Sequence, residues 1–442
     1  MKIPRLRLTN AQVIILGFAA MILVGTALLM LPVSTADGSG ASFADAIFTA
    51  TSAVCVTGLV VQDTATYWST FGHAVIITLI QIGGMGVVTV TVAISLVSGK
   101  RIGLRQRSTM MDSISAPQVG GIVRLTGFIL IMTAAFELIG AVAMAPVFCG
   151  KLGIGRGIWY AVFHSISAFC NAGFDLFGID AKFSSLTGYH DNIAVNVIVM
   201  LLIVIGGIGF LVWDDVRTHK WRWRRYRMQS KVVIVVTLLL ILAPALWFFF
   251  LEFADEPVGE RILHSLFQSV TLRTAGFNTV DFSLISASGI AIMITMMLIG
   301  GSPGSTAGGM KTTTAAVMVS SAMSVFRRRE DTHFFGRRIA PETIRDAATL
   351  VTIYVMLFLS GGIAISVIEG LPLGSCLFET ASAVGTVGVT MGITPTLGMV
   401  SRAILIALMY FGRVGGLTLI FAVTSASPAP SSKLPQEKLT VG

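Results

Sequence analysis

Ser382-Ala383-Val384-Gly385-Thr386-Val387-Gly388 is a short run of small and polar residues between two long apolar segments. Similar runs end at three other glycines, at roughly even intervals along the chain. In a membrane, non-helical backbone is tolerated only where protein or a water-filled cavity surrounds it. The runs therefore predict four loops that meet around one pore. These loops are Val56-Thr57-Gly58, Asn171-Ala172-Gly173, Thr274-Ala275-Gly276 and Thr386-Val387-Gly388.

The composition excludes an ordinary soluble globular protein. Of the 442 residues, 54% are hydrophobic and 12% are charged, which indicates a polytopic membrane protein. The basic N-terminus resembles the start of a secretory signal. The apolar run that follows, residues 11–31, is long enough to span a bilayer, so it is predicted to be the first transmembrane helix.

One unit of organisation occurs four times: a span, an amphipathic half-helix that ends in a glycine loop, and a second span. The predicted fold is an all-α polytopic membrane protein with four span, pore-loop, span repeats. Eight transmembrane helices and four re-entrant half-helices would surround a pseudo-four-fold pore. The repeats are expected at residues 9–100, 115–218, 230–326 and 340–425, followed by a cytoplasmic tail at 426–442. The spans are expected at 11–31, 73–97, 122–148, 191–213, 231–251, 288–326, 347–368 and 400–425, and the half-helices at 43–54, 158–173, 262–276 and 374–388.

The loops have the chemistry of a cation site. A dehydrated cation needs oxygen ligands on several sides, and carbonyl oxygens that point inward supply them without side-chain charge. Glycine permits this because a positive φ lets successive carbonyl groups aim the same way. The half-helices would also direct the partial negative charge of their C-terminal ends toward the cavity.

Small residues recur at aligned positions in the second spans. The aligned pairs are Gly83-Gly84, Gly206-Gly207, Gly300-Gly301 and Gly412-Arg413, and three residues after the first member stand Gly86, Gly209, Pro303 and Gly415. Close helix packing and pore lining are both compatible with these glycines. Arg413 is expected to face the aqueous pore, because an arginine in lipid is costly. Packing of Arg413 against a neighbouring repeat stays an alternative.

The second span of the third repeat cannot be one continuous helix, because it contains several glycines and a proline. An interruption at mid-membrane indicates an ion pathway. Two enzyme motifs overlap this segment and are rejected. The G-x-S-x-G pattern at 300–304 lies inside a span without a preceding strand, and Lys311 comes one position too late for a phosphate-binding loop. No enzyme activity is predicted.

Basic residues follow the second spans of the first three repeats. They are Lys100, Arg101, Arg105 and Arg107, then the region from Arg217 to Lys231, then Arg327, Arg328, Arg329, Arg337 and Arg338. The positive-inside rule therefore places the linkers and both termini in the cytoplasm and the loops 59–72, 174–190, 277–287 and 389–399 outside. The run 220–225 alternates tryptophan with basic residues, which favours an interfacial anchor beside acidic membrane lipid over a nucleic-acid site.

These features together resemble the Trk/Ktr/HKT potassium-transporter superfamily. The resemblance is carried by the loop runs SAVCVTG, SAFCNAG, TLRTAG and SAVGTVG, by GGSPGSTAGGMKTTT at 300–314 and by YFGRVGG at 410–416, and it covers nearly the whole chain. The length and the absence of additional N-terminal spans resemble the B-type, ion-translocating membrane component of Ktr systems more than the longer Trk type.

The resemblance implies the roles of particular residues. The selectivity filter would bind K⁺ at Gly58, Gly173, Gly276 and Gly388 with the two residues before each. A gate would be formed by an intramembrane loop and by an arginine at the constriction. Its members would be Gly300, Gly301, Ser302, Pro303, Gly304, Ser305, Thr306, Gly308, Gly309, Lys311 and Arg413.

The resemblance also implies partners and cargo. K⁺ would be the transported ion, Na⁺ a possible second ion, and the protein a homodimer in the cell membrane. A cytosolic nucleotide-binding ring, of the Ktr A type, would regulate it, so nucleotide would act only through the partner. Two alternatives from other classes are a sodium-coupled secondary symporter of another solute and a membrane anchor or receptor. Symporters of that kind usually show two inverted halves instead of four equivalent loops.

Overall fold

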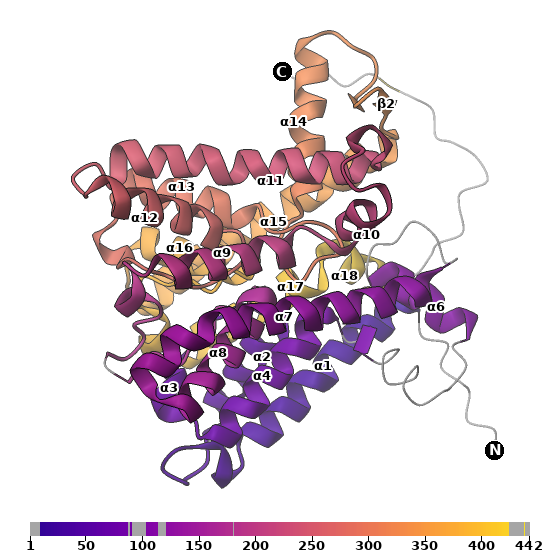
Figure 1. Cartoon of the computed structure of the whole chain (residues 1–442). Coiled ribbons are helices and arrows are strands. Elements are labelled where there is room, and N and C mark those ends of the chain that lie inside the picture. The colour runs from indigo at the N-terminus through magenta and orange to yellow at the C-terminus, as the bar shows by residue number, and fades with distance from the viewer. Residues whose placement is uncertain are drawn as a thin grey trace, which may run out of the picture.

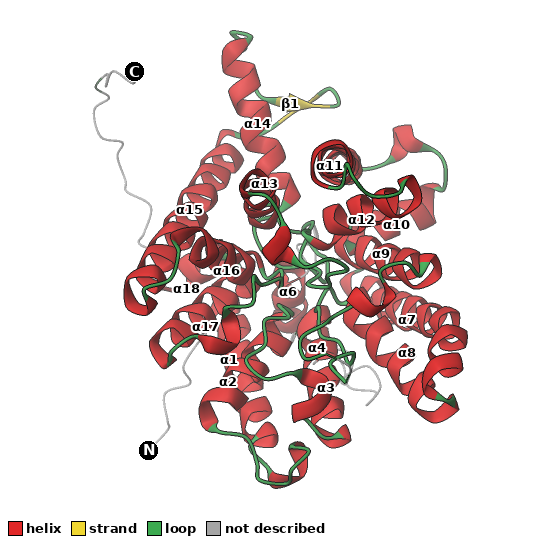
Figure 2. Cartoon of the chain, turned by 90° about the vertical axis from the view of Figure 1, so that its left-hand side faces the viewer, coloured by secondary structure: helices red, strands yellow, loops and turns green. Residues whose placement is uncertain are grey.

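The computed structural model of the chain describes residues 9–86, 89–90, 103–113, 121–179, 181–423 and 437. These residues form four consecutive helical units, which follow one another in the colours of Figure 1. Figure 2 shows the loops gathered in the middle and the helices around them. One short hairpin is the only sheet in this part of the chain. The predicted all-α class is therefore confirmed.

The helices of each unit follow in chain order. The first unit contains α1 (Asn10–Leu29), α2 (Phe43–Cys55), α3 (Thr64–Tyr67), α4 (Thr70–Met85) and α6 (Leu104–Ser113). The second contains α7 (Ile122–Leu152), α8 (Ile154–Phe169), α9 (Ile193–Gly207) and α10 (Phe210–His219). The third contains α11 (Met228–Trp247), α12 (Val258–Thr271), α13 (Ala287–Leu298), α14 (Thr312–Phe326) and the hairpin β1 (His333–Phe334) and β2 (Arg337–Arg338). The fourth contains α15 (Pro341–Glu369), α16 (Leu373–Gly385), α17 (Met399–Val414) and α18 (Gly416–Val423).

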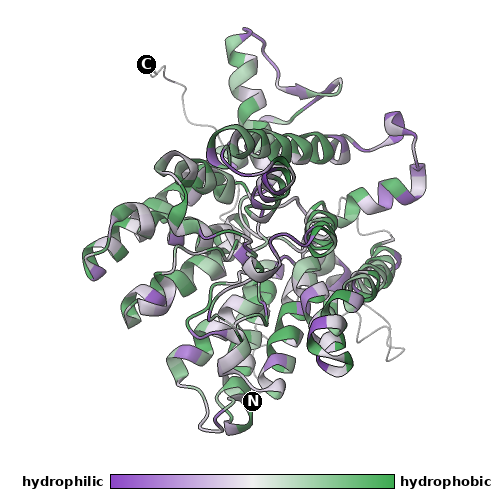
Figure 3. Ribbon diagram, turned by 60° about the vertical axis from the view of Figure 1, so that its left-hand side comes forward, coloured by the Kyte–Doolittle hydropathy of each residue, from purple (hydrophilic) through white to green (hydrophobic). Residues whose placement is uncertain are grey.

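The first helix of each unit is long and apolar enough to cross a membrane. By length and composition, four described helices meet this standard, α1, α7, α11 with its π-helical end, and α15. Most of their surface is not covered by protein: in α7, only 28% of the most apolar window is buried. Figure 3 shows hydrophobic colour along the helices and hydrophilic colour mainly at their ends and in the hairpin. Such uncovered apolar faces are expected to contact lipid acyl chains.

The apolar segment after the glycine loop is broken in the second, third and fourth units and ends at the matching glycine in the first, whereas the sequence predicts a break only in the third unit. α4 ends before Gly86, α9 and α10 meet at 93° across Gly209, and α17 and α18 are separated by Gly415. In the third unit the break contains Gly304. The φ angles of these glycines are +86° for Gly86, +101° for Gly209, +63° for Gly304 and +90° for Gly415. A single glycine in this conformation is enough to end a helix.

Two other expectations cannot be compared in full. The predicted span 73–97 and the tail 426–442 fall largely outside the described residues, as do the proposed repeat boundaries at 100 and 115. The predicted half-helices, in contrast, agree with α2, α8, α12 and α16 within a few residues.

The units pack in a closed cycle. In each unit, the apolar helix that follows the glycine loop contacts the short helix of the next unit. Thus α4 packs on α8, α9 on α12, α13 on α16, and α17 on α2. The last contact joins the fourth unit to the first. The short helices are thereby enclosed, and fully buried aromatic residues anchor them, namely Phe48, Phe163, Phe267 and Phe378.

Candidate functional site

The four short helices end in the same way. At the first position of each predicted loop, a non-glycine residue adopts the left-handed conformation, with φ of +57° at Val56, +58° at Asn171, +65° at Thr274 and +52° at Thr386. The glycine two positions later also has positive φ, of +94° at Gly58, +66° at Gly173, +86° at Gly276 and +96° at Gly388. Two such residues close together reverse the chain direction and expose carbonyl groups instead of continuing the helix.

Serine and threonine residues in the last turn of each helix fix these loops. In the first unit, Ser52 accepts hydrogen bonds from the N–H of Thr57 through its carbonyl oxygen (2.8 Å) and from the N–H of Gly58 through its hydroxyl (3.1 Å). Ser382 makes the same pair of bonds in the fourth unit, at 2.8 and 3.0 Å. Ser167 and Thr271 instead donate their hydroxyls to carbonyl oxygens just after the loop glycine. The sequence pattern gives these four residues no predicted role.

The twelve loop residues form a closed ring, here named the glycine ring. An ideal Cβ atom added to Gly58 would lie 2.5 Å from the carbonyl oxygen of Ala172 in the second unit. The same construction places a Cβ on Gly173 at 2.8 Å from the Ala275 oxygen, on Gly276 at 2.7 Å from the Val387 oxygen, and on Gly388 against the Thr57 oxygen. Each glycine therefore faces the carbonyl of the middle residue in the next loop. Because these distances are too short for a real side chain, only glycine fits at the four positions.

The glycine ring presents oxygen atoms and no charged side chain of its own. The hydroxyls of Thr57, Thr274 and Thr386 are buried and have no hydrogen-bond partner among the described residues. Buried polar groups are normally paired, so these three hydroxyls are available to a ligand that enters the ring. Within the described ranges, no group of three or more His, Cys, Asp or Glu side chains could hold a metal ion. Oxygen ligands in the ring would therefore have to be carbonyls and hydroxyls.

Residues 299–311 connect α13 to α14 and cross the molecule next to the ring. Within this crossing segment, the N–H of Gly300 bonds to the Met310 oxygen at 2.7 Å. The segment is also tied to two other units. Ser302 and Thr306 donate their N–H groups to the carbonyl oxygens of Gly207 and Gly206 at 3.0 and 3.2 Å, and Gly309 donates to that of Gly412 at 3.1 Å. The aligned glycine pairs thus serve as acceptors as well as packing surfaces.

The crossing segment touches the glycine ring directly. The hydroxyl of Thr306 lies 3.0 Å from both the Asn171 side-chain oxygen and the Phe169 carbonyl oxygen. Gly308 lies so close to the Thr386 side chain that a Cβ would collide with it, and a Cβ on Gly309 would lie 2.7 Å from the Gly385 oxygen. The segment therefore contacts the second and fourth loops of the ring together.

Two cations lie beside the crossing segment and are held by carbonyl oxygens. The amine of Lys311 donates to Ala307 at 2.8 Å and to Gly308 at 3.3 Å. The guanidinium of Arg413 donates to Thr306, to Gly83 and, at 2.9 Å, to Gly84. Both side chains line a cavity of about 240 Å³. Arg413 therefore has features of both sequence interpretations, since it packs against other units and also borders an open space.

An acidic residue without a predicted role lies behind the second loop. Gln81 of α4 donates its amide to both carboxyl oxygens of Glu137 in α7, at 2.9 and 3.2 Å. Cys170, three residues before Gly173, also approaches Glu137, with its sulfur 3.9 Å from one carboxyl oxygen. Glu137 is the only acid in the predicted span 122–148, and an acid within a span is a signal for a functional position.

Two further residues brace the segments that follow the ring. Glu379 accepts hydrogen bonds from the Thr390 hydroxyl, from the Met391 N–H at 3.2 Å and from the Thr394 hydroxyl at 2.7 Å. His164, at the aligned position of α8, accepts a bond from the Leu176 N–H at 3.1 Å. Each of these side chains fixes the segment just beyond its own loop glycine.

Comparison with known proteins agrees with this arrangement. The family model TrkH, described as a cation transport protein, matches residues 4–434. The chain is similar to the potassium/sodium uptake protein NtpJ of Enterococcus hirae, with 37% identity over 99% of this chain and 98% of that protein. It is similar also to the Ktr system potassium uptake protein B of Bacillus subtilis, with 38% identity over 94% and 93% of the two chains. The crystal structure of the potassium transporter TrkH from Vibrio parahaemolyticus has the same fold, with a TM-score of 0.75 and 21% identity over 95% of this chain and 86% of that one.

Proposed function

The chain belongs to the TrkH family of cation transport proteins, and on this basis we propose that it takes up potassium ions across the cell membrane through the glycine ring. It is a transporter of the Trk/Ktr superfamily, of the Ktr B type, and not an enzyme. The relatives named for potassium uptake support K⁺ as the cargo, and the name of one of them supports Na⁺ as a second ion.

The closure of the glycine ring is the observation that carries the proposal. Four loops from four units each place a glycine against the carbonyl of the next. A ring of carbonyl oxygens can replace the hydration shell of a monovalent cation. The C-terminal ends of α2, α8, α12 and α16 all lead into the ring, and their partial negative charge favours a cation there. The glycine ring is therefore proposed as the selectivity filter. Its loops are Val56-Thr57-Gly58, Asn171-Ala172-Gly173, Thr274-Ala275-Gly276 and Thr386-Val387-Gly388.

The crossing segment, with Arg413, is proposed as the gate. It contains Gly300, Gly301, Ser302, Pro303, Gly304, Ser305, Thr306, Gly308, Gly309 and Lys311. Its contacts with Asn171 and Thr386 support this role, because a segment that touches two loops of the proposed filter could obstruct an ion that passes through it. Its hydrogen bonds to the second and fourth units would have to change when it moves. A cation at Arg413 would also oppose a passing K⁺ electrostatically.

The assembly and orientation are proposed from the family and from the charge pattern. A homodimer with both termini in the cytoplasm would present the basic linkers to a cytosolic nucleotide-binding ring of the Ktr A type. The names of the Ktr system relatives support a partner protein. Purification of the native protein together with its cytosolic partners would test this part of the proposal.

Ion flux in liposomes tests the function. The purified chain should admit K⁺ and its tracer Rb⁺ faster than protein-free liposomes do, and faster than it admits Na⁺. Protein that is inserted and folded but admits neither ion would contradict the proposal. Uptake of another solute that depends on Na⁺ would instead support the symporter, which four equivalent loops do not favour.

A further inference from the structure

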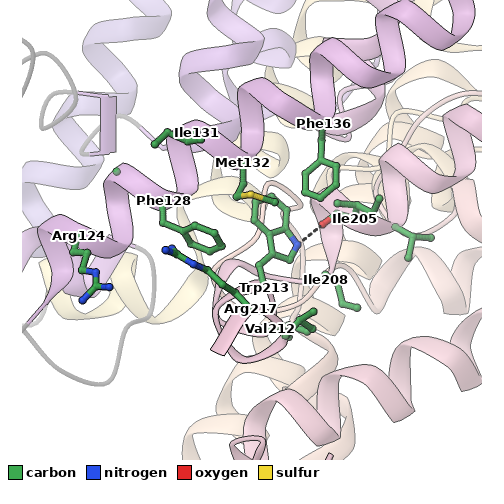
Figure 4. Close-up of a pocket in the computed structure, with 13 residues that line it drawn as sticks. Arg124, Phe128, Ile131, Met132, Phe136, Ile205, Ile208, Val212, Trp213 and Arg217 are labelled. Carbon is green, nitrogen blue, oxygen red and sulfur yellow. Dashed lines mark hydrogen bonds between the residues drawn. The ribbon is translucent and has the colours of Figure 1, made fainter. Parts of the chain in front are cut away.

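A large apolar groove lies on the outer surface of the second unit, away from the ion path. It has a volume of about 900 Å³ and runs between α7 and the corner where α9 meets α10. The corner exists because the chain turns by 93° at Gly209. Trp213 fills the inside of the corner, and its indole N–H donates to the Ile205 carbonyl oxygen at 3.1 Å (Figure 4). The groove is therefore built into the fold and held by a hydrogen bond.

The walls of the groove are hydrophobic along most of its length. Phe136 of α7 packs edge-on against Trp213, with ring centroids 5.5 Å apart, and Ile131, also on α7, is 70% exposed. The lining from Arg124 to Phe136 extends for about 18 Å at 1.5 Å per helical residue. Half of a bilayer's hydrocarbon core is about 15 Å thick. The groove thus has the length of one acyl chain.

Two arginines stand at one end of the groove. Arg217 of α10 lies over the Phe128 ring, with its guanidinium carbon 4.6 Å from the centroid, and Arg124 of α7 is exposed nearby. Neither arginine forms an ion pair with a carboxylate of the described residues. The adjacent acids Asp214 and Asp215 are already paired with Arg227. Two guanidinium groups therefore remain available for an anion that enters the groove from this end.

We propose that this groove binds one anionic phospholipid, with its acyl chain along α7 and its phosphate at Arg124 and Arg217. The inference rests on the proposed orientation, which puts both arginines at the cytoplasmic surface. Basic pockets between helices on that side recognise anionic headgroups. Arginine also suits a phosphate because its planar fork can donate two hydrogen bonds to phosphate oxygens. A zwitterionic lipid would fill the same groove but would gain less from the two charges.

Lipid retention measured by native mass spectrometry tests the proposal. The full-length protein in detergent is mixed with phosphatidylglycerol or with phosphatidylcholine of the same acyl chains. We expect tighter binding of phosphatidylglycerol, and a loss of about tenfold or more in its affinity when Arg124→Gln and Arg217→Gln are combined. The matched control combines Arg327→Gln with Arg337→Gln, two exposed arginines of another linker, and should retain the wild-type affinity.

A second variant tests the apolar part of the site without a change of charge. Ile131→Trp adds bulk to an exposed wall and should reduce retention of phosphatidylglycerol while the protein remains folded. Phosphatidylglycerol with brominated acyl chains should quench the fluorescence of the wild type more than that of Trp213→Phe. Equal retention of the two lipids, or unchanged retention in the double arginine variant, would overturn the proposal. A change of oligomeric state in Ile131→Trp with unchanged lipid retention would assign the groove to a second copy and would overturn it as well.

Discussion

Arg413 and Thr306 belong to different units and are joined by a hydrogen bond from the guanidinium to the Thr306 backbone oxygen. The same guanidinium reaches the first unit at Gly83 and Gly84, and the Thr306 hydroxyl reaches Asn171 in the second unit. One pair of residues thus links all four units beside the glycine ring. A change at either residue is expected to affect the whole ion path.

Removal of the Arg413 charge should accelerate ion flux. At about 10 Å and an effective dielectric constant of about 20, two unit charges repel by roughly 1.7 kcal/mol, which corresponds to a rate difference on the order of tenfold. Arg413→Ala should therefore raise maximal K⁺ flux into liposomes by about that factor, with little change in ion preference. Arg413→Lys keeps the charge and should stay near the wild type. Flux in Arg413→Ala at or below the wild-type level, at equal amounts of inserted protein, would leave Arg413 a packing residue.

A side chain at Gly58 should weaken ion discrimination. Its φ of +94° and the nearby Ala172 oxygen leave no space for a Cβ atom. Gly58→Ser should displace this carbonyl and lower the ratio of K⁺ to Na⁺ uptake. Gly374→Ser is the matched control, since Gly374 lies in the first turn of α16 with open space around it. If both variants discriminate as the wild type does, Gly58 is not part of the filter.

Shortening the crossing segment should open the path. Deletion of residues 304–309 removes the contacts with Asn171 and Thr386, so K⁺ flux should rise and become independent of a cytosolic partner. Thr306→Val is a milder change that removes only the hydroxyl, and it should raise flux to a smaller extent. Dimeric, inserted protein that lacks the segment but conducts no faster than the wild type would place the gate elsewhere.

The repeat and the loop positions could be predicted from the sequence because both depend on local chemistry. Long apolar runs mark the spans, and glycines at matched spacing mark Val56–Gly58 and its three counterparts. The breaks at Gly86, Gly209 and Gly415 could not be predicted, because a glycine in a helix is compatible with both packing and a left-handed turn. Only the backbone angles distinguish the two.

Contacts between residues of different units also could not be predicted from the sequence. The contact of Glu137 with Gln81 joins residues that are far apart in the chain, and nothing local specifies it. Arg413 could be recognised as unusual, but its acceptors are backbone oxygens, which carry no residue signature. The proposed roles of the filter and gate residues therefore rest on geometry and on the family together.

Loss of the acceptor at Glu137 should destabilise the second loop of the ring. Glu137→Leu leaves the half-buried Gln81 amide without its acceptor, and leaving such a group unsatisfied costs up to about 1–3 kcal/mol when it is fully buried. Thermal unfolding in detergent should therefore occur at lower temperature, with reduced K⁺ flux. Glu137→Gln keeps an acceptor oxygen and should lie close to the wild type. Equal unfolding temperatures for Glu137→Leu and the wild type would show that this contact contributes little.

Stability should depend on pH through Asp175, in the loop that follows Gly173. Burial raises the pKa of this carboxyl from 3.8 to about 7, and the charge of Asp63 acts in the same direction. The folded chain then holds the proton more tightly than the unfolded chain, so the contribution to stability is present in acid and is lost as the pH rises through about 7. The unfolding temperature should fall between pH 5 and pH 8.

Asp175→Asn tests this assignment. The amide imitates the protonated carboxyl and can still accept the hydrogen bond from the Phe177 N–H, which is 3.0 Å long in the wild type. In the variant, the unfolding temperature should depend less on pH than it does in the wild type. Asp281→Asn, at an exposed carboxyl that caps Ser283, should leave the wild-type profile unchanged. A profile in Asp175→Asn that is as steep as in the wild type would assign the pH dependence to other groups.

Because the glycine ring is made by one continuous chain, its four quarters are not copies of one another. In a channel built from four identical subunits, one codon change alters every quarter at once. Here a single substitution alters one quarter and leaves three intact, so the ring can change one loop at a time. Its four loops can diverge independently under selection, as the different residues before Gly58, Gly173, Gly276 and Gly388 already illustrate.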